Sequence, residues 1–276
     1  MGDKEYIYSL FHLENKVVIL TGGLGKIGQH YAEALVRAGG RVAIFDITDE
    51  PNEKLKKLAG DFPLLFMKAD ITDEAQVKRA INAVEQKWET PTILVNNAGW
   101  KPAPHRAHES SVPFEDYPVA VWDEVFKINT TGAVICAKTI GKRMIEEKKK
   151  GVIINIASHY ALVSPDQRVY EYKRKEGKQF VKDASYSASK AALLALTKNL
   201  AVEWAPYGIR VVALSPGGVI GPASHPDFIK EYNWRTPLGR MAEADEYNGA
   251  LLFLASDASR YMTGTNLIID GGWTAL

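Results

Sequence analysis

The residues with the clearest capacity for chemistry are Tyr186 and Lys190, four positions apart in a stretch whose pattern predicts a helix as far as Trp204. On a helix, side chains four residues apart lie on one face, so the ammonium group of Lys190 can come close to the phenol of Tyr186. A free tyrosine has a pKa of about 10, and a neighbouring positive charge lowers that pKa, which makes proton transfer feasible near neutral pH. The pair alone also fits an ordinary surface helix, so the surrounding segments must decide between the two interpretations.

The elements that could position such a pair begin with a glycine-rich segment, Gly22–Gly28. The apolar run Lys16–Thr21 before it predicts a buried strand, and a helical pattern follows it as far as Ala38. A second strand, Arg41–Phe45, ends in Asp46. Strand, glycine-rich turn, helix and strand ending in an acid form a unit typical of dinucleotide binding, in which backbone amides approach a pyrophosphate at the helix N-terminus. A tight turn needs glycine with or without a ligand, so the flanking strands and the acid carry this prediction.

The acid at the end of the second strand bears on the choice of cofactor. Asp46 stands 21 residues after Gly25, where its carboxylate can accept hydrogen bonds from the adenosine ribose hydroxyls. The same charge would repel a 2′-phosphate, so the sequence favours NAD(H) over NADP(H). Lys26 adds a cation nearby and slightly weakens that preference.

Strands alternate with helices along the rest of the chain. Further strands are predicted at 64–69, 92–95, 152–157, 209–214 and 266–269, and helices at 73–88, 119–129, 132–147, 186–204 and 242–255. Residues 219–240 form a long irregular segment of the kind that closes over a ligand. The alternation runs without repeat or linker and predicts one domain over residues 1–276. Its fold class is α/β, a Rossmann-type doubly wound parallel sheet of about seven strands with helices on both faces.

Composition excludes several classes of protein. Lys and Arg total 34 against 33 Asp and Glu, so nothing global favours nucleic acid or an anionic membrane. The single cysteine, Cys136, has no disulfide partner, and no His/Cys cluster predicts a metal site. Met1–Leu13 lacks the features of a signal peptide, and no stretch of about 20 apolar residues predicts a membrane span. The expected location is therefore the cytoplasm, with no nucleic-acid or membrane partner.

Several separated motifs resemble the short-chain dehydrogenase/reductase family in its compact, single-domain form. They are Thr21–Gly28, Asn96–Gly99, Asn129, Ser158, Tyr186 with Lys190, Pro216–Gly217 and Asp270–Gly272. The resemblance covers about residues 13–276. It implies hydride transfer to or from nicotinamide, with interconversion of a secondary alcohol and a ketone.

The resemblance also implies four catalytic residues. Tyr186 would exchange the proton on the substrate oxygen, and Ser158 would hydrogen-bond the same oxygen. Lys190 would lower the pKa of Tyr186 and bind the nicotinamide ribose, and Asn129 would hold a water in a proton path to Lys190. Taken singly, Ser158 also fits a cap or turn residue, and Asn129 a helix-terminal one.

The residues expected to contact the cofactor share a position at or just after the carboxyl end of a strand, or on the catalytic helix. They are Gly22, Gly25, Lys26, Ile27, Gly28, Asp46, Ile47, Asp70, Ile71, Asn97, Ala98, Gly99, Tyr186, Lys190, Pro216, Gly217 and Val219. Asp70 and Ile71 would touch the adenine, although Asp70 also fits a cap or turn before the next helix.

Two departures from the family pattern stand out. The glycine spacing is T-G-x-x-G-x-x-G, with Lys26 where a middle glycine is usual, a spacing seen in the larger nucleotide-sugar-modifying branch. The interval from Ser158 to Tyr186 is about twice the usual one, which predicts an enlarged active-site loop, 159–185. Within that loop, residues 168–182 contain six basic side chains against two acidic ones.

The enlarged loop has two interpretations. Its positive charge would suit an anionic substrate such as a sugar acid or a nucleotide-linked sugar, and a similar loop occurs in members tied to surface-sugar or flagellin modification. Alternatively, it is a solvated insertion or a subunit contact.

The sequence leaves alternatives to a simple oxidoreductase, and it also bears on the oligomeric state. An epimerase or dehydratase that retains NAD, or a non-catalytic dinucleotide-binding sensor, would use the same fold. The final segment, Asn266–Leu276, suits a subunit contact, and the resemblance implies a homotetramer or homodimer.

Overall fold

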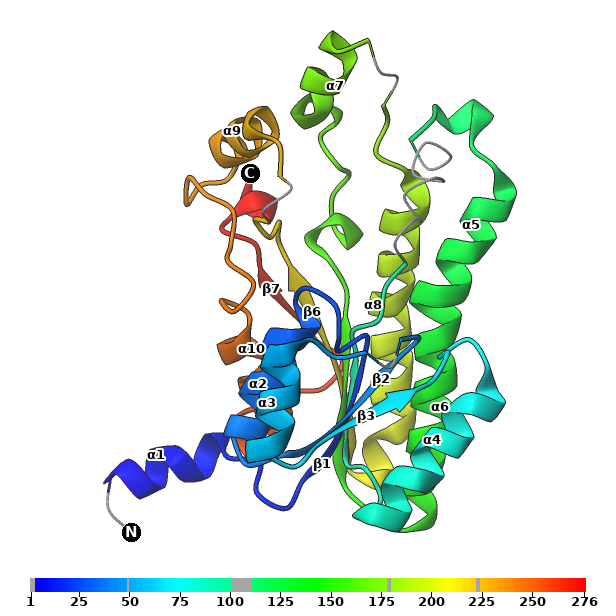
Figure 1. Ribbon diagram of the computed structural model, residues 1–276, viewed down its shortest axis with the longest axis vertical. Helices are drawn as coiled ribbons and strands as arrows, with labels where there is room; N and C mark the ends of the chain where they lie inside the picture. Colours follow the sequence, from blue (N-terminus) through cyan, green and yellow to red (C-terminus); the bar gives the residue numbers. More distant parts are fainter. Residues whose placement is uncertain (1–2, 49, 101–110, 178–179, 222–223) are drawn as a thin grey trace.

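The computed structural model describes residues 3–48, 50–100, 111–177, 180–221 and 224–276, and its centre is one parallel sheet (Figure 1). The strands are β1 (Val17–Thr21), β2 (Arg41–Asp46), β3 (Leu64–Lys68), β4 (Ile93–Asn96), β5 (Gly151–Ile156), β6 (Ile209–Pro216) and β7 (Asn266–Ile269). Their order across the sheet is β3-β2-β1-β4-β5-β6-β7, and every neighbouring pair is parallel. This confirms the predicted doubly wound parallel sheet.

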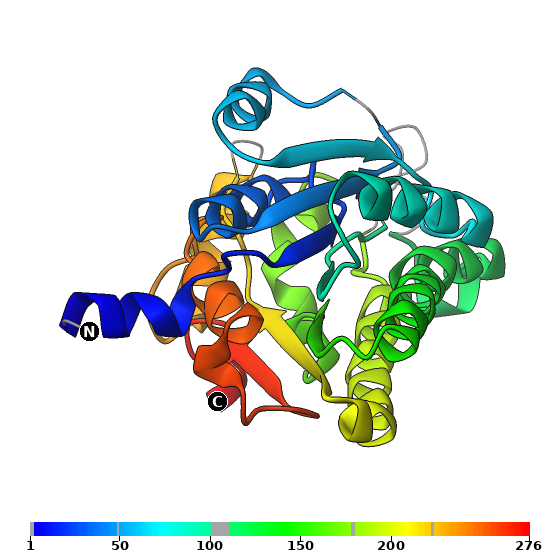
Figure 2. The same cartoon turned by 90° about the horizontal axis from the view of Figure 1, so that it is seen from below.

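Helices connect the strands. The α-helices are α1 (Asp3–Phe11), α2 (Gly28–Arg37), α3 (Glu53–Asp61), α4 (Glu74–Lys87), α5 (Val119–Phe126), α6 (Gly132–Glu146), α7 (Glu171–Lys175), α8 (Ala184–Trp204), α9 (Pro226–Arg235) and α10 (Asn248–Ala255). Figures 1 and 2 show α2, α3 and α10 on one face of the sheet and α4, α6 and α8 on the other. The carboxyl ends of the strands therefore meet at one edge of the sheet between two helical layers.

Strand β1 shows how the sequence produces the two layers. All five of its residues are buried, which is why the run reads as continuously apolar rather than alternating. Successive side chains point to opposite faces, so Val18 and Leu20 join the core beneath α2 and α10, while Val17 and Ile19 join the core beneath α4 and α6.

The helices predicted at 119–129 and 132–147 are one continuous path in the structure. A π-helical turn, η3 (Lys127–Thr131), joins α5 to α6 without a break. The Thr130 hydroxyl donates to the Ser189 carbonyl of α8 at 3.1 Å, so the wide turn is held against α8. Sequence patterns do not reveal such a turn, because it depends on this contact with α8.

Other differences concern local elements. The segment predicted as irregular, 219–240, contains α9, which starts at Pro226 and is capped by His225. The helix predicted at 242–255 begins only at Asn248. Helices α1 and α3 were not predicted, although Asn52 caps α3 by accepting a hydrogen bond from Leu55 N at 2.9 Å.

The enlarged loop, 159–185, contains η4 (His159–Ala161), η5 (Gln167–Tyr170) and α7. In Figure 1 it rises above the carboxyl edge of the sheet beside α9. Together, the described residues of 159–185 and 219–240 are called the cap below. Residues 101–110, in the loop between β4 and α5, lie outside the described part of the chain.

Candidate active site

Tyr186 lies in the first turn of α8, and the start of that helix is fixed by an acid that the sequence analysis missed. Buried Asp183 is the N-cap, and its Oδ1 accepts hydrogen bonds from Tyr186 N at 2.9 Å and from Ser185 Oγ at 2.6 Å. An Asp three residues before the tyrosine is a recognisable cap signal. This contact sets where the catalytic helix begins and so where the Tyr186 side chain points.

Lys190 follows one turn later and is buried. Its Nζ donates to the carbonyl oxygen of Ile156, the last residue of β5, at 2.7 Å. Burial disfavours the charged form and lowers the pKa of Lys190 to about 8. The lysine is therefore poised to gain or lose a proton close to physiological pH.

Ser158 lies two residues beyond the end of β5, beside Tyr186. Its Oγ accepts a hydrogen bond from Tyr160 N at 3.2 Å. Burial raises the pKa of Tyr186, while its hydrogen bond with Ser158 lowers it and the charge of Asp183 raises it. The direction is opposite to the one expected from the Tyr186–Lys190 spacing, because burial outweighs the hydrogen bond from Ser158. Tyr186 thus carries its proton at neutral pH.

Asn129 is buried in the π-helical turn and uses both ends of its amide. Its Oδ1 accepts from Trp100 N at 2.6 Å, and its Nδ2 donates to Ser189 Oγ at 2.9 Å. A side chain placed on Gly99 would have its Cβ 3.7 Å from Asn129 Oδ1 and 4.0 Å from Lys190 Nζ. The structure therefore brings Asn129 and Lys190 to the same side of Gly99, at the carboxyl end of β4.

The glycine-rich turn forms a tight cradle between β1 and α2. Gly22 has φ +63°, and a Cβ there would lie 2.6 Å from Ala98 Cα. A Cβ on Gly28 would lie 2.3 Å from the Gly22 carbonyl oxygen. Within the described chain, the backbone N–H groups of Lys26, Ile27 and Gly28 have no hydrogen-bond acceptor. Free amides at a helix N-terminus, with no side chain in the way, fit a dinucleotide pyrophosphate.

Asp46 and Lys26 both contact the protein itself at this turn. Asp46 Oδ2 accepts from Leu24 N at 3.1 Å, and its Oδ1 accepts from Thr48 N at 3.4 Å. Lys26 Nζ donates to Val219 O at 2.9 Å, which joins the glycine-rich turn to the cap. Burial lowers the pKa of Lys26. The predicted cation is thus next to the turn, and its contact with Val219 was not foreseen.

Other residues expected at the cofactor crevice are tied to neighbouring strand ends. Asn97 Nδ2 donates to Thr21 O at 3.1 Å and to Gly22 O at 2.9 Å, and the Thr21 hydroxyl accepts from Ala98 N at 3.0 Å. Asp70 Oδ1 accepts from Thr72 N at 2.8 Å, the turn role considered for it above. These contacts hold the crevice in shape.

Two apolar residues expected to contact the cofactor, Ile47 and Ile71, differ in exposure. Ile71 is buried against Gly132, whereas the Ile47 side chain is 67% exposed. Ile47 therefore offers an open apolar surface beside Asp46.

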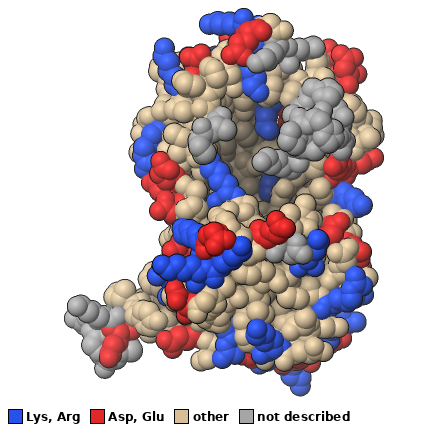
Figure 3. Space-filling view, viewed as in Figure 1, with Lys and Arg blue, Asp and Glu red and all other residues tan. Residues whose placement is uncertain are grey.

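At the far end of the crevice, Gly217 continues the sheet. Its N–H donates to Ile269 O at 2.8 Å, and a Cβ there would meet Asp270 Cα at 2.8 Å. The next residues, Gly218 and Val219, lead into the cap. Figure 3 shows this side of the molecule hollowed in its upper half, with Lys or Arg side chains visible inside the hollow.

The positive charges of the enlarged loop are matched by acids or aromatic rings. Arg168 pairs with Asp166 at 2.8 Å, Arg174 with Glu171 at 2.8 Å, and Lys182 with Asp183 at 3.7 Å. Lys173 lies 3.6 Å above the centre of the Phe180 ring, and the charge of Lys175 helps to lower the pKa of Glu231. Lys178 lies outside the described residues. The described part of the loop therefore offers a ligand less free charge than the sequence count implied.

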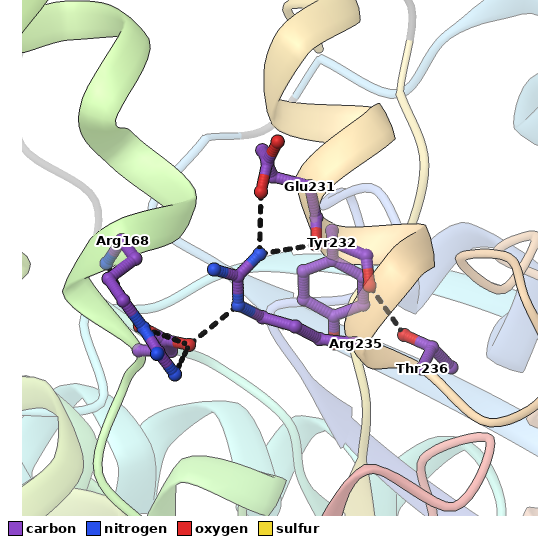
Figure 4. Close-up of polar contacts among 6 residues, drawn as sticks. Arg168, Glu231, Tyr232, Arg235 and Thr236 are labelled. Carbon is purple, nitrogen blue, oxygen red and sulfur yellow. Dashed lines mark hydrogen bonds and ion pairs between the residues drawn. The ribbon is translucent and has the colours of Figure 1, made fainter.

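The two halves of the cap are fastened to each other. Arg235 of α9 donates from Nε to Asp166 Oδ2 at 2.6 Å and from Nη1 to Glu231 Oε2 at 2.8 Å. Figure 4 shows the Arg235 guanidinium between Arg168 and Glu231. The rings of Tyr172 and His225 stack with centroids 4.2 Å apart. The contacts of Arg235 with Asp166 and of Tyr172 with His225 were not predicted from the sequence, because these partners are more than 50 residues apart.

A cavity of about 470 Å³ adjoins the catalytic helix, lined among others by Tyr160, Lys182 and Ser187. Among the described residues, no group of three or more His, Cys, Asp or Glu side chains is arranged to hold a metal ion. No helix in the described ranges is both long enough and apolar enough to cross a membrane.

Comparison with known proteins adds relatives over almost the whole chain. A family model described as enoyl-(acyl carrier protein) reductase matches residues 24–274. The sorbose reductase of Candida albicans is 33% identical over 97% of this chain and 90% of its own. The D-threitol dehydrogenase of Mycolicibacterium smegmatis is 34% identical over 96% of this chain and 95% of its own.

Solved structures agree with this fold. A short-chain dehydrogenase from Leptospira borgpetersenii with bound NAD+ superposes with a TM-score of 0.83 at 33% identity, over 97% of this chain and 95% of its own. A gluconate 5-dehydrogenase from Burkholderia cenocepacia, in complex with NADP and tartrate, gives 0.84 at 29% identity, over 98% and 99%. The two neighbours differ in cofactor, so the fold alone does not select one.

Proposed function

Because the chain belongs to the short-chain dehydrogenase/reductase family, we propose that it is an NAD(H)-dependent oxidoreductase that interconverts a secondary alcohol and a ketone on a small polyol or sugar. The observation that carries the proposal is the meeting of four predicted residues at one place. Tyr186, Ser158 and Lys190 lie where α8 meets the end of β5, and Asn129 and Lys190 share one side of Gly99.

The protonation states of the site suit proton exchange with a substrate oxygen. Tyr186 keeps its proton at neutral pH, so it acts directly as the acid in carbonyl reduction. Ser158 donates a hydrogen bond to the same oxygen as negative charge develops on it. When bound, the nicotinamide supplies or accepts the hydride.

After reduction, Tyr186 needs a new proton. Lys190 is one helical turn away, and its pKa of about 8 lets it pass a proton at physiological pH. Asn129, on the same side of Gly99, would hold the water that brings the proton from solvent. In alcohol oxidation the proton moves in the opposite direction, and Tyr186 acts as the base once its own proton has passed towards solvent.

The proposed preference for NAD(H) rests on Asp46 at the end of β2. Its carboxylate would accept hydrogen bonds from the ribose hydroxyls and repel a 2′-phosphate. Gly22, Gly25, Lys26, Ile27 and Gly28 would surround the pyrophosphate, with Ile47, Asp70 and Ile71 at the adenine. Asn97, Ala98, Gly99, Pro216, Gly217 and Val219 would line the nicotinamide half.

A polyol or sugar substrate is supported by the relatives, which are named for sorbose and D-threitol. Arg168 and Arg174 of the loop are engaged in ion pairs and Lys173 lies over the Phe180 ring, so the loop gives weaker support to a sugar acid or nucleotide-linked sugar than its basic residues suggested. An epimerase or dehydratase that retains NAD differs in one respect, since it would not accumulate NADH during turnover. A non-catalytic sensor would not need the buried, destabilising Lys190.

The same family membership supports three further proposals. We take residues 1–276 as one domain, the location as the cytoplasm, and the assembly as a homotetramer or homodimer. Chromatography with light scattering would give the assembly, and a monomer would contradict it.

The function is tested by cofactor binding followed by turnover. Calorimetry should show tighter binding of NADH than of NADPH, and Asp46→Ala should relax that preference by about tenfold or more, equivalent to losing one charge-assisted hydrogen bond. Oxidation of threitol, arabinitol or glycerol with NAD+, or reduction of sorbose with NADH, should then change the absorbance of NADH. Binding of neither nucleotide would contradict the proposal, and an unchanged preference in Asp46→Ala would show that Asp46 does not face the ribose.

A further inference from the structure

His159, directly after Ser158, is almost fully buried and has a partner at each ring nitrogen. Its Nδ1 lies 3.1 Å from the carbonyl oxygen of Pro216, and its Nε2 lies 3.3 Å from the hydroxyl of Tyr232 in α9. The same hydroxyl accepts a hydrogen bond from Gly218 N at 2.7 Å. These groups form a chain of hydrogen bonds from Tyr232 in α9 to His159, the residue next to Ser158.

The chemistry of the end groups fixes the direction of every hydrogen bond in the chain. A carbonyl oxygen can only accept, so the His159 proton is on Nδ1. A backbone N–H can only donate, so the Tyr232 oxygen accepts from Gly218. In a neutral ring whose one proton is on Nδ1, Nε2 can only accept, so the Tyr232 hydrogen points at Nε2. One neutral tautomer therefore satisfies all the partners. Burial lowers the pKa of His159, which agrees with a neutral ring.

The chain joins three elements that the reaction needs together. His159 begins η4 after Ser158, Pro216 to Gly218 form the turn after β6, and Tyr232 belongs to the cap. The Tyr232 ring is held by stacking on Trp273, with centroids 4.4 Å apart and planes 27° from parallel. A Cβ on Gly218 would lie 2.4 Å from Tyr232 Cζ, so the ring lies directly against the turn.

We propose that His159 and Tyr232 are positioning residues of the reaction, which set Ser158 and the Pro216–Gly218 turn in one register and make that register depend on α9. The inference rests on the proposed function. His159 and Tyr232 would act through the neighbouring Ser158 on one side and through the turn expected beside the nicotinamide on the other. If α9 moved away from His159, Ser158 and the Pro216–Gly218 turn would therefore lose this common support.

Two conservative substitutions remove the central hydrogen bond from either side. Tyr232→Phe keeps the ring on Trp273 and deletes only the hydroxyl. His159→Asn keeps an amide donor near the position of Nδ1 for Pro216 O and deletes the Nε2 acceptor. Tyr31→Phe is the matched control, because Tyr31 is also fully buried but its hydroxyl has no partner in the described structure.

Each single variant should lose about tenfold in kcat, since one buried hydrogen bond of the site is lost. The KM for the polyol and the Kd for NADH should change by less than about threefold, and Tyr31→Phe should keep the wild-type kcat. If the two residues act as one chain, the double variant should also lose about tenfold. A loss of about a hundredfold in the kcat of the double variant would show that the two residues act independently. That result, or an unchanged kcat in either single variant, would overturn the positioning role.

The tautomer gives a readout that does not depend on activity. Imidazole 15N chemical shifts of histidine-labelled protein should show His159 protonated on Nδ1, with the Nε2 resonance moving in Tyr232→Phe; His159→Asn identifies the resonance. Protonation on Nε2 would overturn the hydrogen-bond chain. A wild type that binds no NADH and turns over no polyol would instead contradict the proposed function, so the two failures can be told apart.

Discussion

The catalytic residues and the cap are held by opposite kinds of contacts. Lys190 is buried against a single backbone carbonyl, and Asn129 has one partner at each end of its amide. Apart from the buried His159–Tyr232 contact, the two halves of the cap are joined by partly exposed ion pairs and stacked rings, such as Arg235 with Asp166 and Tyr172 with His225. Burying a lysine destabilises the fold, whereas cap contacts are numerous and individually weak. Substitutions at the proposed catalytic residues should therefore lower kcat strongly and can raise or lower the stability of the fold. Substitutions in the surface contacts of the cap should change kcat and stability only modestly.

The largest effect is expected from Tyr186→Phe. The variant lacks the hydroxyl that exchanges the proton, so kcat/KM should fall by about 10³-fold or more, within the range for a general acid or base. The Kd for NADH should stay within about threefold, because the ring remains in place. Tyr261→Phe, at a fully exposed side chain, is the control and should leave both values unchanged. Turnover close to the wild type in Tyr186→Phe would exclude this residue as the proton donor.

Lys190→Met should separate activity from stability. The pKa of Lys190 is lowered from 10.5 to about 8, which corresponds to roughly 3 kcal/mol of destabilisation of the charged form at 1.36 kcal/mol per unit. The variant loses the hydrogen bond to Ile156 O, worth about 1 kcal/mol. We therefore expect a net gain of about 1–2 kcal/mol at pH 7, seen as a higher Tm, together with a loss of about 10²-fold or more in kcat.

The pH dependence of that gain has a definite sign. A lysine with a lowered pKa destabilises the folded state fully below pH 8, where it is charged in both states. Between pH 8 and about 10.5 the unfolded chain binds more protons, so wild-type stability rises with pH. The Tm advantage of Lys190→Met should shrink between pH 7 and pH 9.5. An advantage that grows with pH would show that burial does not lower this pKa.

The same contrast explains what the sequence could predict. Tyr186 with Lys190 and the glycine-rich turn could be proposed from the sequence because their signals are short-range: the two side chains share a helix face, and the turn lies between one strand and one helix. The doubly wound parallel sheet followed from the alternation of apolar runs and helical patterns, whereas the order of its strands was not predicted. Helix α9 was missed because its polar exposed face gives a weak apolar pattern.

Contacts between distant segments were beyond sequence reasoning. Arg235 meets Asp166 across 69 positions, and Tyr232 meets His159 across 73. The raised pKa of Tyr186 was missed for a related reason, since it depends on the packing around a partly buried ring rather than on the spacing to Lys190. Composition gave six basic residues in the loop, but only the folded chain shows which acids pair with them, such as Asp166 with Arg168 and Glu171 with Arg174.

The smallest effect is expected in the cap, from Asp166→Asn. The Asp166 and Arg235 side chains are only 19% and 12% exposed, so their ion pair is partly shielded from water. Two arginines hold the pKa of Asp166 well below its usual range, with Arg168 as the stronger partner. An exposed pair contributes at most about 1 kcal/mol and a buried one more, so we expect a loss of about 1–2 kcal/mol at pH 7. The catalytic residues are not touched, and kcat should change by less than about threefold.

The pH profile of this loss distinguishes the ion pair from simple repacking. A carboxyl with a lowered pKa stabilises the fold above its unfolded value of 3.8, and the contribution disappears as pH falls through the lowered pKa. The Tm difference between wild type and Asp166→Asn should therefore be constant from pH 7 to about 5 and shrink towards pH 3. Glu53→Gln, which removes the exposed partner of Lys56, should leave Tm unchanged throughout. If Asp166→Asn, like Glu53→Gln, left Tm unchanged at every pH, the Asp166–Arg235 ion pair would contribute nothing to stability. The two halves of the cap would then be joined by their stacked rings, and the cap would differ from the proposed catalytic residues only in how deeply its side chains are buried.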